Sequence, residues 1–263
     1  MAIQRNEEYL YKKNLPEFVE FCKKTEGDWV FIISGDEGSG KSALGVQIAG
    51  YIQAMFQRPL IIKDYYIDSL EEYIDKTRRD MNTPFSIKFF DEAVKMFYSR
   101  DFARKVNSIL MKFFTINRSF QQIHILTIPS PFYIDKYIRE WRVRCWIFTY
   151  IDPDTKKRWF AFYSRERFEN VIFSQKARKA MMNNRKFVET PAFAPDYVAT
   201  FSLPPERIWK DYKEIKGEKQ KDFLNSIEEE VRGLAEEEKY LRNRRKYWKH
   251  YKKMEGEEEV ELF

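Results

Sequence analysis

Glycine is scarce in this chain, yet five of its nine glycines lie between Gly35 and Gly50. Within that stretch the residues GDEGSGKS match the pattern G-x-x-x-x-G-K-[ST] without a mismatch. Glycines allow consecutive backbone N–H groups to turn toward one anion, and the N-terminus of a following helix adds free amides. The pattern predicts a nucleotide-phosphate site, with the Lys41 ammonium at the β- and γ-phosphates and the Ser42 hydroxyl on Mg²⁺. The residues that we predict to bind the nucleotide are Gly35, Asp36, Glu37, Gly38, Ser39, Gly40, Lys41, Ser42 and Ala43.

Two adjacent carboxylates, Asp91 and Glu92, follow the short and mostly apolar run 87–90. The carboxyl ends of parallel strands meet at one edge of a sheet, so we expect this pair to lie beside the glycine-rich loop. There Asp91 would hold Mg²⁺ together with Ser42, and Glu92 would act as the general base that activates water. The alternative is structural, because Asp at a helix cap and Glu in the first turn also favour the start of a helix.

Two hydroxyl side chains, Thr127 and Ser130, stand at the end of the apolar run 123–128. A polar side chain at this place could contact the γ-phosphate of a bound nucleotide. The alternative for either residue is a turn hydroxyl that precedes proline. The sequence does not choose between Thr127 and Ser130.

Apolar periodicity gives the elements that must position these residues. We predict strands at 29–34, 60–62, 86–90, 123–128, 144–151 and 158–163. We predict helices at 14–27, 42–56, 67–79, 102–119 and 133–140. Strands that alternate with helices indicate an α/β fold with a mostly parallel central sheet flanked by helices.

The pattern changes after about residue 190, where four prolines occur within 190–205. We therefore predict a P-loop domain at 1–190, a proline-rich linker at 191–205 and a charged helical extension at 206–263. The run 239–253 has eight Lys or Arg residues, no acidic residue and interleaved aromatic side chains, which suits contact with DNA. The alternatives are a solvated helix face or a segment neutralised by the acidic end 255–261. If the tail does not bind DNA, the next basic candidates are Lys105, Lys112, Arg139 and Arg142.

The composition of the chain excludes several classes of protein. The 263 residues carry a formal net charge of +6, and no apolar run approaches the roughly 20 residues that a membrane helix needs. The polar N-terminus has no apolar signal region. We therefore expect no membrane insertion and a cytoplasmic location, in the host cytoplasm if the protein is viral. With only two cysteines and two histidines, a metal cluster of these residues or a histidine-dependent triad is not expected.

From residue 31 to about residue 150 the chain resembles the P-loop ATPases of the FtsK–HerA superfamily, which include viral genome-packaging ATPases and zonula occludens toxin-type proteins. The resemblance rests on GDEGSGKS, FFDEA, a basic helix that ends at Asn117-Arg118, HILTIPSP, Ile134-Asp135 and Ile138-Arg139. It implies ATP and Mg²⁺ as ligands, and self-association into a ring, possibly a hexamer. In such rings an arginine of one subunit reaches the γ-phosphate of its neighbour, and here the candidates are Arg100, Arg104 and above all Arg118.

The same resemblance implies an ATPase that moves DNA, as in genome packaging, extrusion or DNA transfer. Two other functions remain open from the residues themselves. One is an assembly protein that ATP switches without movement along DNA. The other is a small-molecule phosphotransferase. Glu92 argues for water rather than an alcohol as the acceptor, and no obvious Arg-rich lid stands out in the sequence.

Overall fold

The computed structural model describes residues 10–94, 109, 112–176, 179 and 191–255. Two compact units divide the chain, Met1–Tyr212 and Lys213–Phe263. The sheet and all the residues of the candidate site that the structure describes belong to the first unit.

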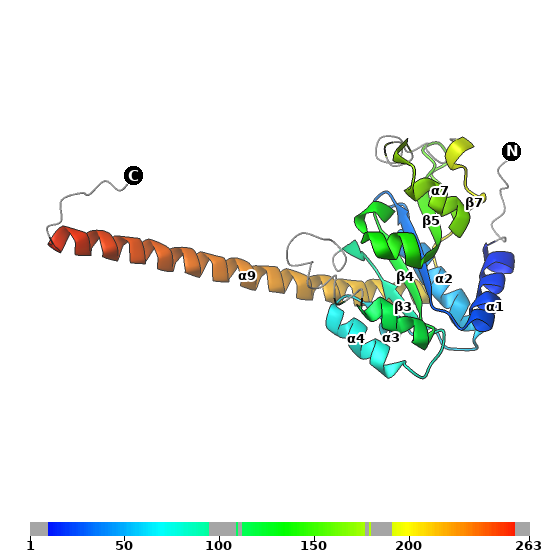
Figure 1. Ribbon diagram of the computed structural model, residues 1–263, viewed down its shortest axis with the longest axis horizontal. Helices are drawn as coiled ribbons and strands as arrows, with labels where there is room; N and C mark the ends of the chain where they lie inside the picture. Colours follow the sequence, from blue (N-terminus) through cyan, green and yellow to red (C-terminus); the bar gives the residue numbers. More distant parts are fainter. Residues whose placement is uncertain (1–9, 95–108, 110–111, 177–178, 180–190, 256–263) are drawn as a thin grey trace. The chain divides into compact units, whose positions relative to one another are not determined.

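The first unit is built on a seven-stranded sheet in the order β2-β3-β4-β1-β5-β6-β7 (Figure 1). The strands β2, β3, β4, β1 and β5 run parallel, and β6 is antiparallel to both of its neighbours. Their bounds are β1 Trp29–Gly35, β2 Tyr66–Ile67, β3 Ile87–Phe90, β4 Ile123–Ile128, β5 Val143–Ile151, β6 Arg158–Ser164 and β7 Tyr197–Thr200. The predicted α/β fold with a mostly parallel sheet is confirmed.

Helices cover both faces of this sheet, which explains why its inner strands are continuously apolar. One face carries α2 against β1, β3 and β4, with α1 beside α2, and the other carries α7 against β5 and β6. The main helices are α1 Leu15–Thr25, α2 Lys41–Met55, α3 Ile62–Tyr65, α4 Leu70–Arg79, α7 Arg165–Ile172 and α9 Glu206–Glu255. Short helical turns are η1 Leu10–Asn14, η2 Arg118–Phe120, η3 Pro131–Tyr133, η4 Ile138–Arg142 and η6 Pro191–Phe193.

Close packing of α2 on the sheet fixes the helix that follows the glycine-rich loop. A Cβ added at Gly45 would lie 2.6 Å from the Phe89 ring, so this glycine lets α2 approach β3 closely. The parallel register pairs Ser34 of β1 with Ile128 of β4, and Phe90 of β3 with Leu126 of β4. The carboxyl ends of these three strands therefore meet at one edge of the sheet.

Two helix and strand predictions differ from the structure around residue 62. The predicted strand 60–62 is not formed, because Ile62 begins the short helix α3 and the strand follows as β2. The predicted helix 67–79 begins only at Leu70, since the Ser69 side chain caps it by accepting a hydrogen bond from the Glu72 N–H at 3.1 Å. Most of the predicted helix 102–119 lies outside the described residues, and 112–117 is helical.

The segment 191–205, predicted as a linker, contains the strand β7 and belongs to the first compact unit, which runs to Tyr212. Tyr197, Val198 and Ala199 are buried because β7 pairs with β6 as the last strand of the sheet. The prolines stand outside these four strand residues, where they remove no hydrogen bond from the ladder. Proline density therefore marked the ends of an edge strand rather than a free linker.

His124, Cys22 and Cys145 are all buried in the first unit. His124 is fully buried on β4 and shares a 3.0 Å hydrogen bond with the Tyr73 hydroxyl. Burial lowers the pKa of His124 to about 3, so the ring stays neutral and structural. Cys22 and Cys145 are buried free thiols.

The second unit is helical where the structure describes it, from Lys213 to the end of α9 at Glu255. The exposed large apolar side chains among its described residues are Phe223, Leu224, Ile227, Val231, Leu234, Tyr240 and Leu241. Among the described residues, no helix of either unit combines the length and the apolar character that crossing a bilayer requires.

Candidate active site

The glycine-rich loop joins β1 to α2 and has the backbone that its sequence predicts. Gly35, Gly38 and Gly40 have φ values of +146°, +74° and +98°, a region that side chains with a Cβ disfavour. Gly35 has a second constraint, because a Cβ there would lie 2.0 Å from the carbonyl oxygen of Thr149 on β5. The loop ends at Gly40, the N-cap of α2, so the free amides of that helix face the loop.

Lys41 lies over this loop. Its ammonium nitrogen donates hydrogen bonds to the carbonyl oxygens of Gly35 at 2.9 Å and Asp36 at 2.8 Å. These two neutral carbonyl oxygens hold the positive charge of Lys41 against the loop. A phosphate group is a stronger partner for an ammonium than a carbonyl oxygen is, because the pair is then ionic on both sides. The position suits the contact with phosphates that the sequence predicts.

Ser42 and Asp91 are brought together by the first turn of α2 and the end of β3. The Ser42 hydroxyl donates to Asp91 Oδ1 at 2.7 Å, and Asp91 is only 4% exposed. Two more hydroxyls donate to the same carboxylate, from Thr127 to Oδ1 at 2.8 Å and from Tyr212 to Oδ2 at 2.5 Å. A buried carboxylate needs such donors, because burial without them costs several kcal/mol, on the order of 2 to 7 for a polar group.

Glu92 follows Asp91 but differs from it in burial and backbone. Its side chain is exposed, and its φ is +54°, in the left-handed region. The first turn of an α-helix needs φ near −60°, so the alternative prediction, that Glu92 is a first-turn residue of a helix, is not what the backbone shows. The left-handed backbone is held by a 2.9 Å hydrogen bond from the Glu92 N–H to the Thr127 hydroxyl oxygen. A non-glycine residue held at positive φ costs of order 1–3 kcal/mol and marks a candidate functional position.

Thr127 and Ser130, which the sequence could not separate, have different surroundings. Thr127 is buried at the end of β4 and contacts both acidic residues through its one hydroxyl. Ser130 caps the short turn η3 by accepting a hydrogen bond from the Phe132 N–H at 3.4 Å. Thr127 therefore belongs to the candidate site, whereas Ser130 has the role of a turn hydroxyl.

The arrangement of Ser42 and Asp91 fits Mg²⁺. This ion prefers hard oxygen ligands and keeps several waters, and it binds proteins through one or two side chains together with substrate phosphates. No group of three or more His, Cys, Asp or Glu side chains suited to a metal occurs among the described residues, so a site rich in protein ligands is not formed there. The hydroxyl–carboxylate pair at 2.7 Å, next to the phosphate loop, meets the simpler requirement.

Of the three arginines proposed for trans contact, the structure describes Arg118, which is not part of this site within one chain. Arg118 is exposed on η2, just before the start of β4, whereas the phosphate loop follows the end of β1. Since β1 and β4 are parallel, Arg118 stands at the opposite edge of the sheet. Arg100 and Arg104 lie outside the described residues.

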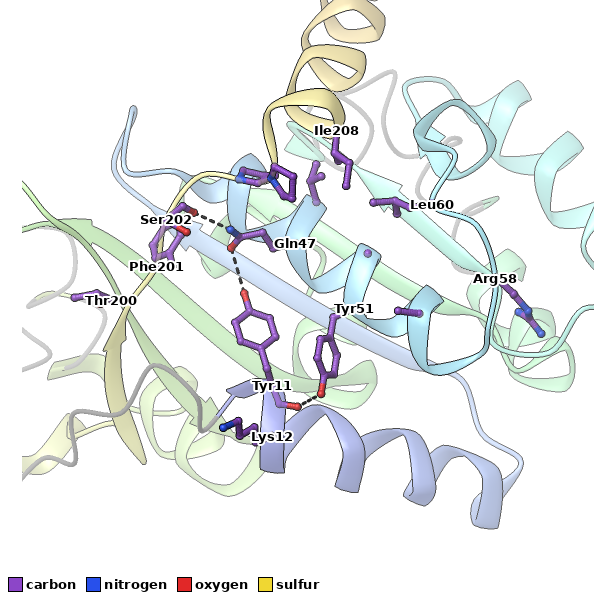
Figure 2. Close-up of a pocket in the computed structure, with 15 residues that line it drawn as sticks. Tyr11, Lys12, Gln47, Tyr51, Arg58, Leu60, Thr200, Phe201, Ser202 and Ile208 are labelled. Carbon is purple, nitrogen blue, oxygen red and sulfur yellow. Dashed lines mark hydrogen bonds between the residues drawn. The ribbon is translucent and has the colours of Figure 1, made fainter.

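A largely apolar cavity of about 770 Å³ lies along α2 (Figure 2). Phe201 lines this cavity and also approaches the phosphate loop, because a Cβ added at Gly40 would lie 2.9 Å from the Phe201 ring. Gln47 spans the cavity, accepting from the Tyr11 hydroxyl at 3.1 Å and donating to the Ser202 carbonyl at 2.8 Å. The residues that line the cavity are Tyr11, Lys12, Val46, Gln47, Gly50, Tyr51, Ala54, Arg58, Leu60, Thr200, Phe201, Ser202, Pro204, Pro205 and Ile208.

Sequence reasoning missed two residues of this region, Tyr212 and Phe201. Both come from the part of the chain after residue 190, which was assigned to a linker and an extension. For Tyr212 the available signal is an aromatic residue in a charged segment, which is not specific. Only the position of β7 and the first turns of α9 bring these rings to the site.

No family model matches this chain, and no curated protein matches it. Among solved structures, the N-terminal domain of zonular occludens toxin from Neisseria meningitidis is similar at 17% identity, covering 70% of this chain and 98% of that one, with a TM-score of 0.43. The genome packaging NTPase B204 from Sulfolobus turreted icosahedral virus 2, in complex with AMP, is similar at 14% identity, covering 54% of this chain and 95% of that one, with a TM-score of 0.37. These are the two kinds of protein that the motifs of this chain resemble.

Proposed function

We propose that this protein hydrolyses ATP with Mg²⁺. The observation that carries the proposal is the 2.7 Å hydrogen bond from Ser42 to Asp91, because it joins the phosphate loop to the acidic strand end. A glycine-rich loop alone could be a turn, and an Asp-Glu pair alone could begin a helix. Together at one sheet edge, the two form the parts of a nucleotide site that hold phosphate and metal.

The binding roles follow from the contacts. Lys41 would exchange its two loop carbonyls for the β- and γ-phosphates, and the loop amides with the N-terminus of α2 would hold the same groups. Ser42 and Asp91 would hold Mg²⁺, which when bound neutralises charge on the phosphates. The Ser42 hydroxyl can keep donating to Asp91 while its oxygen faces the metal.

Glu92 is the general base of this proposal. Its side chain is exposed, in contrast to the buried Asp91, so that it can reach a water molecule beside the γ-phosphate. Thr127 holds both acids at once, through the Asp91 carboxylate and the Glu92 backbone. We take water rather than an alcohol as the nucleophile, as in the ATPases that the motifs of this chain resemble, and Glu92 would accept the proton of that water.

The cavity along α2 is a suitable place for the base of the nucleotide. A purine is flat and apolar on its faces, and it stacks well on aromatic side chains. Phe201 contacts the loop at Gly40, so a nucleotide whose phosphates lie on the loop could reach this ring. Tyr11 and Gln47 supply polar atoms deeper in the cavity.

We further propose that ATP hydrolysis drives movement along DNA by a ring of subunits, with Arg118 reaching the neighbouring site. Support comes from the sequence resemblance and from the tail, whose basic side chains from Lys239 to Lys246 are exposed. Two of the alternative DNA contacts are less suitable, because Arg142 pairs with Asp28 and Arg139 pairs with Glu140 within the chain. The place of Arg118 at the edge opposite its own phosphate loop is compatible with a role in another subunit's site.

Replacing Glu92 with Gln tests hydrolysis. The amide keeps the size of the side chain but cannot take a proton, so ATP should still bind while turnover falls by about 10²-fold or more. Phosphate release and nucleotide binding are measured on the same sample. The matched control is Glu71→Gln, an exposed glutamate in the first turn of α4, which should turn over ATP like the parent. Normal turnover in Glu92→Gln would remove Glu92 from the mechanism.

Replacing Phe201 with Ala tests the place of the base. Loss of one stacked ring should weaken ATP binding by about tenfold, since base–aromatic stacking contributes roughly 1–3 kcal/mol. Binding of inorganic tripolyphosphate, which has no base, should not change. The control is Phe173→Ala, an exposed phenylalanine at the end of α7. If tripolyphosphate and ATP weaken equally, Phe201 supports the loop rather than the base.

Neutralising the basic tail tests the DNA contact. The variant changes four exposed residues to Gln, Arg242, Arg244, Arg245 and Lys246. The control changes four exposed residues of the first unit to Gln, Lys24, Lys63, Arg78 and Lys136. In the tail variant alone, the slope of log affinity for DNA against log salt should flatten by about 0.7 to 0.9 for each DNA phosphate that the tail no longer neutralises.

The same experiment separates the competing functions when ATP turnover is followed with and without DNA. A translocating ATPase should turn over faster with DNA, and the tail variant should lose part of that stimulation while its basal rate persists. Turnover that ignores DNA, with assembly that depends on ATP, would favour the switched assembly protein. An unchanged salt slope in a folded tail variant would contradict DNA binding by the tail.

A further inference from the structure

Tyr212 stands in the second turn of α9, yet its hydroxyl lies in the candidate active site. It donates a hydrogen bond to Asp91 Oδ2 at 2.5 Å, across a sequence separation of 121 residues. The side chain is only 2% exposed. Tyr212, the third donor to Asp91, belongs neither to the glycine-rich loop nor to the acidic pair.

Neighbouring aromatic rings fix the position of the Tyr212 ring. Trp209, one turn earlier in α9, stacks on it with ring centres 4.8 Å apart and planes 14° apart. Tyr66 of β2 and Phe89 of β3 lie on its other sides, at ring-centre distances of 6.3 Å and 6.5 Å. A ring enclosed in this way has few alternative rotamers, so its hydroxyl is held at one place.

The Tyr212 hydroxyl can donate one hydrogen bond, and here that bond goes to Asp91 Oδ2. A hydrogen bond from a hydroxyl to an ionised carboxylate is stronger than one between neutral groups.

The two oxygens of the Asp91 carboxylate receive hydrogen bonds from different donors. Oδ1 receives the hydroxyls of Ser42 and Thr127, whereas Oδ2 receives Tyr212. This division fixes the plane of the carboxylate and turns Oδ1 toward Ser42. We propose that Tyr212 is a positioning residue of the Mg²⁺ site, which holds Asp91 in the orientation that the metal needs.

The consequence is that the first two turns of α9 are part of the catalytic site rather than an appendage to it. A displacement of Trp209 or Tyr212 would withdraw the donor from Oδ2 and free the carboxylate to rotate. This inference rests on the proposed function, since it concerns the same Mg²⁺–nucleotide site. It adds a residue and an element that the loop and the acidic pair do not supply.

The test is Tyr212→Phe in the full chain, which removes the hydroxyl and keeps the ring. Binding of the slowly hydrolysed analogue ATPγS is titrated in EDTA and at a series of Mg²⁺ concentrations. In EDTA the variant should bind like the parent, because the loop and Lys41 are unchanged. The Mg²⁺ concentration that gives half of the metal-dependent gain in affinity should rise about tenfold, as expected for loss of one charge-assisted hydrogen bond.

Tyr65→Phe is the matched control, because Tyr65 is also a buried tyrosine of the first unit. Within the described residues, its hydroxyl makes no hydrogen bond. This variant should leave the Mg²⁺ midpoint unchanged. Melting temperatures of both variants show whether folding is affected. Trp209→Leu serves as a second variant that keeps the hydroxyl but removes the stacked ring, and it should raise the Mg²⁺ midpoint in the same direction by a smaller factor.

The outcomes distinguish this inference from the proposed function. If the parent binds no nucleotide, or binds it without any effect of Mg²⁺, the proposed function fails. If the parent depends on Mg²⁺ and Tyr212→Phe has the same midpoint as Tyr65→Phe, the proposed function stands and Tyr212 is only a packing residue. A lower midpoint in Tyr212→Phe would show that the hydroxyl opposes the metal, and it would also overturn the inference.

Discussion

Burial of the Asp91 carboxylate is the constraint on which the structure of this site depends. Asp91 is nearly excluded from solvent, so each of its oxygens needs donors from the protein. Those donors come from three separate elements, α2, β4 and α9. The phosphate loop, the middle of the sheet and the C-terminal helix therefore meet at one group, and movement of any of the three changes its surroundings.

The sheet supplies the rigidity that this meeting needs. Parallel pairing of β3, β4 and β1 puts their carboxyl ends side by side, while Gly45 lets α2 pack directly on Phe89. Next to these packed strands lie two segments whose backbone has positive φ values, the glycine-rich loop and Glu92. Thr127 stabilises the second of these and contacts Asp91 with the same hydroxyl. One buried threonine thus positions the proposed metal ligand and the proposed base together.

The sequence predicts the parts of this site that depend on local chemistry. A glycine pattern, a strand that ends in two acids and apolar periodicity are enough for the loop, for Asp91 and Glu92, and for the α/β sheet. It does not predict Tyr212, Phe201 or the strand β7, because their roles arise only from pairing between distant segments. Prolines around Tyr197–Thr200 resemble a linker when the partner strand β6 is unknown. Thr127 and Ser130 look alike in the sequence, and only the register of β4 beside β3 separates them.

The central claim is that the phosphate loop and Asp91 form one Mg²⁺-dependent site for ATP. The most direct measurement is phosphate release from ATP by the full chain, with Mg²⁺ and with EDTA, beside the variant Lys41→Ala. We predict release that requires Mg²⁺ and falls to background in the variant, because Lys41 would supply the cation that contacts the phosphates. Release that continues in EDTA, or that is equal in Lys41→Ala, would contradict it.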